Sequence, residues 1–591
     1  MKALLAALLL AAGLAHAAPD TPSGNDGPRI DALLAFARTY GVVRYFHPSD
    51  SLDRVDWNRF LLAGAERAGH VTDRAQLGRE LEALFTPIAT GFQVATPQTQ
   101  AADIAGDGDR IEWRHLGYGM EPMPRNVPFV SWRTHHDPLH DGKVKGPYFQ
   151  HQNEAQAPVH EHTTMHVELL PGMDALVPVS LPMSATKVDE AQAARLKDLA
   201  AALPAGDGEA ERLTRAQSWA DGIAAWNVAR HFYPYWDVTP IDWDQHLRRW
   251  LAAQPGQQSR AQLHDQLRRL IAPLDDGDGR IVDPRDKSPR QQLPISVRPL
   301  GERWVVDASL VPDRVKPGDV IVAVNDRPAR AYFEELLAME SGSPHFARWR
   351  AARDFVVGPQ GQNVTLRLDR AGKAVNASVA YDHAKTVIMP RPDALSEVRP
   401  GIFYVDLSRF DRAAFEAAIP KLAAARGVVF DLRGYPAPEA AIVVPFWLTH
   451  PDSAQWMMLP RFDKPFGQFR TGWSTGFKQE GNAALAKPVK VLLTDGRASG
   501  YAESLVGYFA GHRTGQVVGE ATAGENGNVA AATLPSGLKY VFTAMRVTRH
   551  DGTLLHKQGF TPDVAVVPSL EGLRAGRDEV LERALALIPA S

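Results

Sequence analysis

The sequence predicts a multidomain α/β protein in which a duplicated helical module is followed by a β-rich unit and a largely parallel α/β unit. The chain has 591 residues, which is too long for a single hydrophobic core. Residues 41–91 match residues 227–277 without a gap. From residue 401 onward, short apolar runs alternate with helical patterns, as is typical of a parallel sheet.

The composition is that of a globular protein, with 45% hydrophobic and 23% charged residues. The formal net charge of −3 gives no reason to expect binding to nucleic acid or general attraction to membranes. The absence of cysteine excludes disulfides and thiol chemistry.

Residues 1–18 are predicted to be a signal peptide. Lys2 precedes a short apolar run at 3–14, and Ala15-His16-Ala17 has the small-x-small pattern of a cleavage site. The run is too short to span a bilayer, and no other uninterrupted run approaches the required length. We therefore expect an exported protein of the bacterial periplasm with no membrane span after signal removal. An uncleaved anchor is the competing interpretation.

The internal repeat predicts two helical modules, at residues 30–91 and 186–294. In each copy a helix ends at an aromatic-proline corner, a second helix starts near Asp-Trp, and a third has leucines at helical spacing. Two copies do not make a solenoid. We expect the corners to pack as core, with a ligand cradle as the alternative. Matched residues include Val42/Val228, Arg44/Arg230, Phe46/Phe232, Pro48/Pro234, Asp56/Asp242, Trp57/Trp243 and Leu61/Leu247.

Residues 92–185, between the copies, are predicted to form a small β domain because apolar and polar residues alternate there. This segment holds eight of the 20 histidines. His160, His162 and His166 could seat a metal, because alternate residues of a strand share a face. No further ligand is placed by recognisable spacing, so no metal is assigned and polar loops are the expectation. The eight histidines are His115, His135, His136, His140, His151, His160, His162 and His166.

Residues 295–385 resemble a PDZ-type domain. The phrase VKPGDVIVAVND at 315–326 supplies a Pro-Gly turn, an alternating strand and an Asn-Asp turn, followed by a predicted helix at 331–339 and a strand at 364–368. PDZ folds bind an extended peptide as an added strand. The residues assigned here to peptide binding are Val315, Lys316, Pro317 and Gly318. The alternative is a β-rich spacer between two lobes.

Residues 395–591 are predicted to be the α/β unit, with buried strands at 402–407, 427–432 and 491–494 and helices at 413–425 and 576–588. The strand at 491–494 leads into the small-residue turn DGRASGYAE at 495–503 and a helix. The start of a helix favours developing negative charge, as a serine hydrolase requires. An ordinary crossover with a small-residue turn is the alternative.

These phrases resemble the S41 peptidases, the tail-specific or C-terminal-processing proteases. The resemblance rests on the turn at 495–503, GVVFDLRG at 427–434, GEATAG at 519–524 and GFTPD at 559–563. It covers roughly residue 295 to the C-terminus. It implies a ClpP/crotonase-like tail-specific-protease domain, serine-type proteolysis and peptide gating by the PDZ-like domain.

The sequence departs from the family pattern at its decisive positions. Counted from Glu503, the family's serine position is Gly500, and Ser499 is the nearest hydroxyl. Where many members have a lysine base this chain has Glu525, so it resembles the subgroup without the catalytic lysine. In that subgroup a histidine position corresponds to Asp278, and a glutamate position falls at or near His556.

Two main hypotheses follow, both without a cofactor. The first is a serine peptidase acting on peptides or unfolded chains. In it Ser499 is the nucleophile and His556 the base, with Glu503 as another catalytic candidate, and the Gly434 and Gly500 N–H groups are oxyanion donors. The second is a non-catalytic relative that binds peptides. A metal-dependent hydrolase using the histidine-rich insert is a third alternative. Asp431 and Arg433 are expected to form a structural ion pair.

Overall fold

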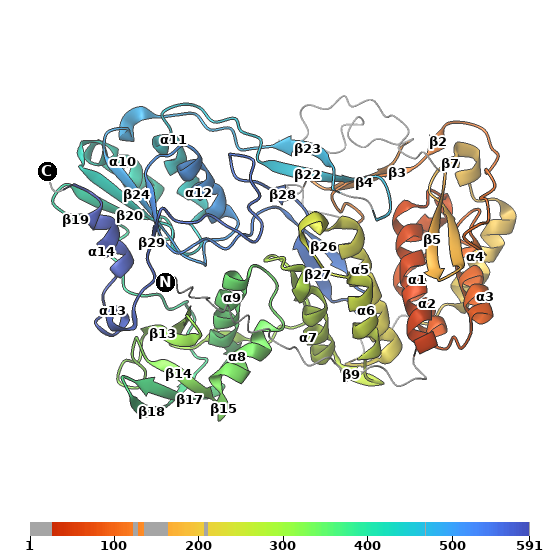
Figure 1. Ribbon diagram of the computed structural model, residues 1–591, viewed down its shortest axis with the longest axis horizontal. Helices are drawn as coiled ribbons and strands as arrows, with labels where there is room; N and C mark the ends of the chain where they lie inside the picture. Colours follow the sequence, from red (N-terminus) through yellow and green to blue (C-terminus); the bar gives the residue numbers. More distant parts are fainter. Residues whose placement is uncertain (1–26, 122–127, 135–162, 206–210, 467–468, 590–591) are drawn as a thin grey trace, which may run out of the picture.

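The computed structural model describes residues 27–121, 128–134, 163–205, 211–466 and 469–589, so the predicted signal peptide lies outside the described residues. The first helical copy lies at one end of the long axis, and the α/β and β-rich units lie at the other (Figure 1). Within the described part, no helix is long and apolar enough to cross a membrane. The chain is thus a mixed α/β, multidomain protein, as predicted.

Both copies of the repeat fold into three helices. The matched aspartates Asp56 and Asp242 cap the second helix of each copy, each accepting a hydrogen bond from the backbone N–H three residues ahead. Such a cap satisfies an N–H group that has no partner within the helix. The helices are α1 (Gly27–Phe46), α2 (Trp57–Ala68) and α3 (Arg74–Phe85) in the first copy, and α5 (Arg215–Phe232), α6 (Trp243–Ala252) and α7 (Arg260–Ile271) in the second.

The two aromatic-proline corners pack against each other. The Tyr45 ring meets Phe232 edge-on at 5.0 Å between centroids, and Phe46 meets His231 at 5.3 Å. Phe46 and Phe232 are almost completely buried. Edge-to-face contacts of this kind stabilise a core beyond simple area burial. The corners are packing elements, as predicted.

His47, at the first corner, makes stability depend on pH. It is fully buried, its Nδ1 lies 2.6 Å from the carbonyl oxygen of Pro178, and burial lowers its pKa from 6.5 to about 4. The folded chain keeps His47 neutral while the unfolded chain takes up a proton below pH 6.5. This residue's contribution to stability is therefore lost as the pH falls from about 6.5 to 4, by about 3 kcal/mol.

We expect the stability lost in His47→Gln to be greatest at pH 7 and to shrink by about 3 kcal/mol at pH 4. Urea denaturation across this range measures the free energy of unfolding of the parent and the variant. In the difference between the two, the contributions of all other titrating groups cancel. His70→Gln, at an exposed histidine, is the control for replacing a histidine that is not buried. Parallel stability curves for His47→Gln and the parent would contradict the prediction.

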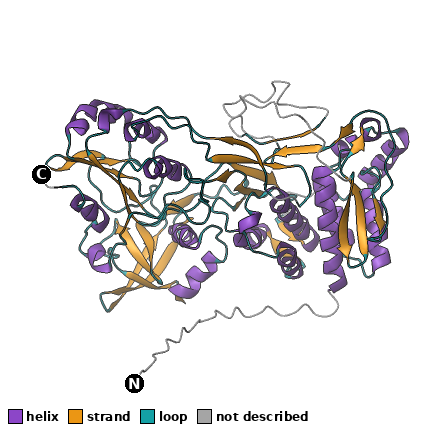
Figure 2. Cartoon of the chain, turned by 45° about the horizontal axis from the view of Figure 1, so that its top comes forward, coloured by secondary structure: helices purple, strands orange, loops and turns teal. Residues whose placement is uncertain are grey.

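The segment between the copies forms small antiparallel sheets that lie against the first copy (Figures 1 and 2). Strands β3 and β4 continue into β22 (Met457–Phe462) and β23 (Thr471–Thr475) of the C-terminal region, so this segment is joined to the α/β unit. The elements are β1 (Gln93–Ala95), β2 (Arg110–Ile111), β3 (Trp113–Leu116), β4 (Val130–Arg133), β5 (Thr164–Leu170), β6 (Met173–Pro178), β7 (Leu181–Pro182) and α4 (Glu190–Ala202).

Two histidines of this segment are described, and both have protein partners. His115 is buried and contacts the Ser131 hydroxyl and the Tyr45 carbonyl oxygen, at 2.7 and 2.8 Å. His166 pairs with Asp174 at 3.0 Å. The other six, including His160 and His162, lie outside the described residues. Over the part that the structure describes, no group of three or more ligating side chains could hold a metal ion.

The β-rich unit is an antiparallel sheet in the order β12-β13-β14-β17-β18, with β15 beside β14 and its own hydrophobic core. The predicted helix and strand are observed as α8 and β17, and α9 is an addition to the predicted elements. The elements are β12 (Ile295–Leu300), β13 (Arg303–Ser309), β14 (Val320–Val324), β15 (Arg327–Pro328), α8 (Ala329–Leu337), α9 (Pro344–Val356), β17 (Asn363–Arg370) and β18 (Lys373–Ala380).

The α/β unit is built on a sheet in the order β19-β20-β21-β24-β25-β29, parallel except for β19. Every residue of β21 is buried, as expected of a strand covered on both faces. The predicted strands and helices appear within two or three residues of their expected ends. The elements are β19 (Leu395–Arg399), β20 (Ile402–Asp406), α10 (Arg412–Ala424), β21 (Gly427–Asp431), α11 (Val444–Trp447), β24 (Val489–Thr494), α12 (Tyr501–Gly511), β25 (Gln516–Gly519), β29 (Val564–Ala565), α13 (Leu570–Arg574) and α14 (Glu579–Ala586).

Short strands tie the α/β unit to the preceding parts of the chain. Strand β10, which follows the second helical copy, pairs with β27, and β22 pairs with β3. One hydrophobic core accordingly runs from the helical copies into the α/β unit. The remaining strands are β8 (Arg212–Thr214), β9 (Gln257–Ser259), β10 (Arg280–Val282), β11 (Arg290–Gln292), β16 (Val357–Pro359), β22 (Met457–Phe462), β23 (Thr471–Thr475), β26 (Val529–Thr533), β27 (Lys539–Thr543) and β28 (Arg546–Val547).

Candidate functional site

The turn between β24 and α12 forms a sharp elbow at Gly500. Asp495 is buried, and its carboxylate accepts a hydrogen bond from the Arg497 backbone N–H at 3.0 Å and pairs with the Arg497 side chain. Gly500 caps α12 with φ 57° and ψ −116°. Side chains rarely adopt this conformation, although a nucleophile on a strained strand-to-helix turn is a recurring arrangement in hydrolases.

The surroundings of residue 500 leave room for a side chain. A Cβ atom built on Gly500 meets only Cε2 of Tyr435, at 3.9 Å. The N–H groups of Tyr501 and Gly434 donate no hydrogen bond to another described residue. In hydrolases with this kind of elbow, the N–H of the residue after the nucleophile is an oxyanion donor. The local geometry therefore suits a nucleophile at position 500, where this chain has none.

Ser499 lies one position earlier and lines a cavity together with Gly434 and Tyr435. A nucleophile at Ser499 would need the Gly500 N–H as its nearest oxyanion donor. That N–H instead donates to the carbonyl oxygen of Glu525, at 2.6 Å. In this conformation the Gly500 N–H is therefore already hydrogen-bonded, and its role as an oxyanion donor stays a prediction. The Gly434 N–H donates to no other described residue.

Glu503 holds the glycine-rich loop after β25. Its carboxylate accepts hydrogen bonds from the Thr522 hydroxyl and from the backbone N–H groups of Gly524 and Glu525, the last two at 2.8 Å. Burial raises the pKa of Glu503 to about 8 despite these bonds. Because both oxygens are engaged, these contacts position the loop beside the elbow. A role as a base stays a prediction.

His556 is enclosed by the second helical copy. Its Nε2 lies 3.1 Å from the Tyr233 hydroxyl, its ring stacks on Tyr235 at 3.9 Å, and its Nδ1 lies 3.5 Å from the Glu525 carboxylate. Burial lowers the pKa of His556 to about 4. Burial, together with the charges of Asp276 and Asp278, raises the pKa of Glu525 well above its ordinary value. The contact therefore joins an imidazole that is neutral at neutral pH to a carboxyl whose charged form is disfavoured by burial.

Asp278 reaches the neighbourhood of residue 500 from the end of the second helical copy. Burial and the charge of Asp276 raise the pKa of Asp278 to about 6. Burial and the charge of Asp278 in turn raise the pKa of Tyr435, the residue nearest to a side chain at position 500. Asp278, which the family resemblance places at a histidine position, is thus a carboxylate close to the elbow.

Helix α9 of the β-rich unit touches the three loops of the site. At its N-terminus the Ser343 hydroxyl donates to the Ala523 carbonyl oxygen at 2.7 Å, in the glycine-rich loop. In its middle, Trp349 packs on Gly496 and under the Arg497 guanidinium, at 5.0 Å. Arg350 donates to the carbonyl oxygens of Gly277 and Gly279. No sequence motif pointed to this role, because each contact joins segments far apart in the chain.

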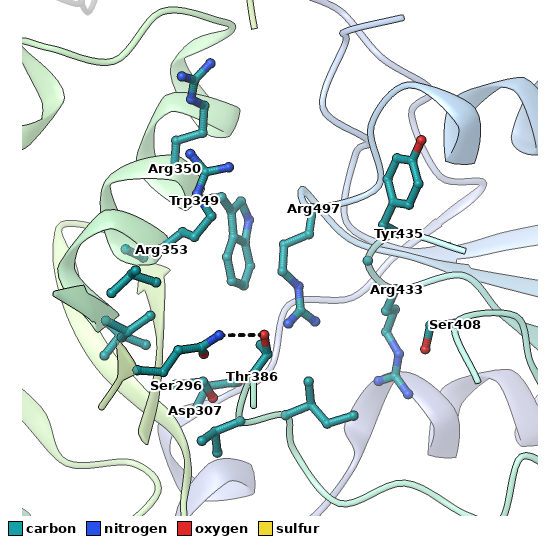
Figure 3. A pocket seen from close by; sticks show the side chains of 18 of the residues that line it. Ser296, Asp307, Trp349, Arg350, Arg353, Thr386, Ser408, Arg433, Tyr435 and Arg497 are labelled. Atoms are coloured by element: carbon teal, nitrogen blue, oxygen red, sulfur yellow. Dashed lines mark hydrogen bonds between the residues drawn. The ribbon is translucent and has the colours of Figure 1, made fainter. Parts of the chain in front are cut away.

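A cavity of about 710 Å³ lies between α9 and β12 on one side and the loops of the α/β unit on the other (Figure 3). Ser499, Gly434 and Tyr435 are in its wall, whereas Val315, Lys316, Pro317 and Gly318 are not. That turn packs instead against α13, where a Cβ on Gly318 would lie 2.5 Å from Cγ of Arg574. Asp431 and Arg433 form the expected buried ion pair, at 2.6 Å.

Comparison with known proteins shows which proteins this chain resembles. Residues 462–566 match the model of peptidase family S41. The chain is 27% identical over 218 residues to a carboxyl-terminal-processing protease of a Synechocystis species, covering 35% of this chain and 48% of that protein. It is 25% identical over 397 residues to a chloroplastic C-terminal processing peptidase of Tetradesmus obliquus, covering 63% and 80%.

A solved structure of mature CPAF bound to lactacystin has a similar fold, with a TM-score of 0.51 at 12% identity, covering 63% of this chain and 98% of that one. The predicted resemblance to the S41 peptidases is confirmed. The matches support a resemblance to hydrolases of the peptidase class. The chain spans about half the length of the Synechocystis relative.

Proposed function

We propose that this S41-type chain binds extended peptides or unfolded protein segments in the cavity without cutting them through the family's elbow position. One observation carries the proposal: the elbow, the free N–H groups and the open space converge on residue 500, which is glycine. Glycine has no group that can attack a carbonyl carbon. The binding surface of a peptidase is present and its nucleophile is absent.

The candidate base also argues against cleavage. His556 is almost fully buried between Tyr235, Tyr233 and Glu525 and is not part of the cavity wall. A general base must come within hydrogen-bond reach of the proton it takes. The hydrogen bonds of His556 connect it to the helical copy and the glycine-rich loop.

An open strand edge supports peptide binding. Strand β12 pairs only with β13 in the described sheet, and Ser296 and Val297 of β12 line the cavity. An extended peptide can add to such an edge through backbone hydrogen bonds, as in PDZ domains. We accordingly assign the β-rich unit a PDZ-like role in gating the cavity. Export through the predicted signal peptide and peptide contacts at 315–318 remain parts of the proposal.

The second candidate is a peptidase that uses Ser499, and the place of Ser499 in the cavity wall favours it. It requires a local rearrangement that frees the Gly500 N–H from Glu525. A metal-dependent hydrolase has no supporting cluster among the described residues. Chelator sensitivity would be its signature.

Peptide binding and hydrolysis, measured side by side, test the proposal. Protein lacking residues 1–18 is mixed with labelled peptides and with casein, beside Ser499→Ala and Gly500→Ser. We expect the parent and Ser499→Ala to bind peptide equally and to cut nothing. Cleavage by the parent that Ser499→Ala abolishes would overturn the proposal in favour of the second candidate.

Gly500→Ser separates two forms of the proposed state. Cleavage that appears only in this variant would mean that the site lost its serine and kept the rest of its machinery. Binding without cleavage in Gly500→Ser would mean that the base is missing as well. Both results agree with peptide binding by the parent.

A further inference from the structure

We propose that the cavity selects peptides carrying a carboxylate group, with Arg497 as the principal contact. This inference rests on the proposed peptide binding and names the chemical class of ligand. It follows from which charged groups face the cavity, which of their donors remain free, and where their counter-charges lie.

The charged groups in the cavity wall are nearly all arginines. Arg350, Arg353, Arg391, Arg433 and Arg497 line it, and the only acidic residue in the described lining is Asp307. Asp307 is 4% exposed and accepts a hydrogen bond from Nε of Arg298 at 2.6 Å. A bound peptide therefore meets guanidinium groups.

Four of the carboxylates that balance these arginines are withdrawn from solvent. Asp431, Asp495 and Asp406 are no more than 1% exposed, and Glu340 is 5% exposed. None of the four belongs to the described cavity wall. Of the five arginines, only Arg497 and Arg353 have side chains that are substantially exposed, 29% and 61%. These two guanidinium groups favour an anionic ligand over a cationic one.

Arg497 is the arginine best placed to bind a ligand. Its Nε and Nη2 are hydrogen-bonded to Asp495, while its Nη1 donates to no other described residue. The guanidinium lies over Trp349, and 29% of the side chain is exposed. Figure 3 shows it extending between Trp349 and Arg433. It stands three residues before Gly500, where the peptide would pass.

The neighbouring arginines differ in how many of their guanidinium N–H groups are already hydrogen-bonded within the protein. Arg433 uses its three nitrogens on Asp431 and Asp578. Arg350 is engaged with Glu340 and backbone carbonyl oxygens. Arg353 is 61% exposed and holds only Asp354, at 3.3 Å, so it can add a second contact. One charge-assisted hydrogen bond at Arg497 should change affinity by about tenfold.

A peptide carboxylate has two sources, an acidic side chain or the C-terminus. The test uses fluorescence anisotropy with labelled peptides of one length. One contains glutamate and has an amidated C-terminus, a second replaces glutamate by glutamine, a third uses lysine, and a fourth has glutamine with a free C-terminus. We expect at least one carboxylate peptide to bind about tenfold more tightly than the amidated glutamine peptide, and the lysine peptide to bind most weakly.

Arg497→Gln should remove this preference, so that this variant binds the glutamate peptide and the amidated glutamine peptide equally. Arg497→Lys retains the charge, so it should keep part of the preference even if loss of the Asp495 pair loosens the elbow. Arg330→Gln, at an 84% exposed arginine outside the cavity wall, is the matched control and should behave like the parent.

Equal binding of the glutamate, amidated glutamine and free C-terminus peptides would overturn this inference while leaving the proposed function in place. So would a preference that persists unchanged in Arg497→Gln. Failure of every peptide to bind would instead overturn the proposed function, and this inference with it. A preference for the glutamate peptide alone would assign the contact to an acidic side chain, and one for the free C-terminus would assign it to the chain end.

Discussion

Arg350→Met is expected to lower the free energy of unfolding by about 3 kcal/mol. Nε of Arg350 lies 2.6 Å from the Glu340 carboxylate, whose side chain is completely buried. The same guanidinium donates to the carbonyl oxygens of Gly277, Gly279 and Ser341. Methionine fills similar volume but leaves these buried oxygens without a donor. Arg268 still pairs with Glu340, which limits the loss.

Chemical denaturation of Arg350→Met and Arg353→Met measures this effect. Arg353 lies three residues later on the same helix, and its ion pair with Asp354 is largely exposed. Exposed pairs contribute less than about 1 kcal/mol, so Arg353→Met should stay close to the parent. If the two variants lost equal amounts of free energy of unfolding, burial of the Arg350 ion pair would not contribute to stability and the prediction would be wrong. The Arg350 variant should also bind peptide more weakly, because α9 would no longer hold the loop at 277–279.

Gly519→Ala is expected to lower the free energy of unfolding by more than about 3 kcal/mol. Gly519 has φ 127°, and a Cβ there would lie 2.1 Å from the carbonyl oxygen of Thr494. That oxygen belongs to the backbone of β24, which pairs with β25 at this point. The clash can be relieved only by separating the strands just before the elbow. We therefore expect a lower melting temperature and weakened peptide binding together.

Gly372→Ala is the matched control for this variant. Gly372 lies between β17 and β18 with φ 84°, and no atom would lie within 4 Å of an added Cβ. The Gly372→Ala variant has the backbone strain of an alanine at positive φ but no clash. Its free energy of unfolding should therefore fall by about 1–2 kcal/mol. The difference between the two variants isolates the contact with Thr494. A Gly519→Ala protein as stable as Gly372→Ala would show that the sheet yields easily at this position.

Features that depend on neighbours in the chain could be predicted from the sequence. The internal repeat implied two similar three-helix units, and Asp56 and Asp242 start the second helix of each because a capping side chain reaches only three residues ahead. The apolar run at 427–431 became a fully buried strand. Asp431 and Arg433 paired as expected because they are two residues apart.

The sequence also located the elbow, and the family resemblance, counted from Glu503, implies that Gly500 takes the serine position. It could not show that the Gly500 N–H is bonded to Glu525, or that His556 is enclosed by Tyr233, 323 residues away. The contacts of α9 with the loops also join residues far apart in the chain, such as Ser343 with Ala523, 180 residues away, and Arg350 with Gly277, 73 residues away. Such contacts depend on which surfaces meet when the units pack, and no local periodicity or spacing encodes that. By itself, the sequence determined the family resemblance, the repeat and the glycine at the position where that resemblance implies a nucleophile. Only the tertiary structure decided which donors stay free and which charges face the cavity.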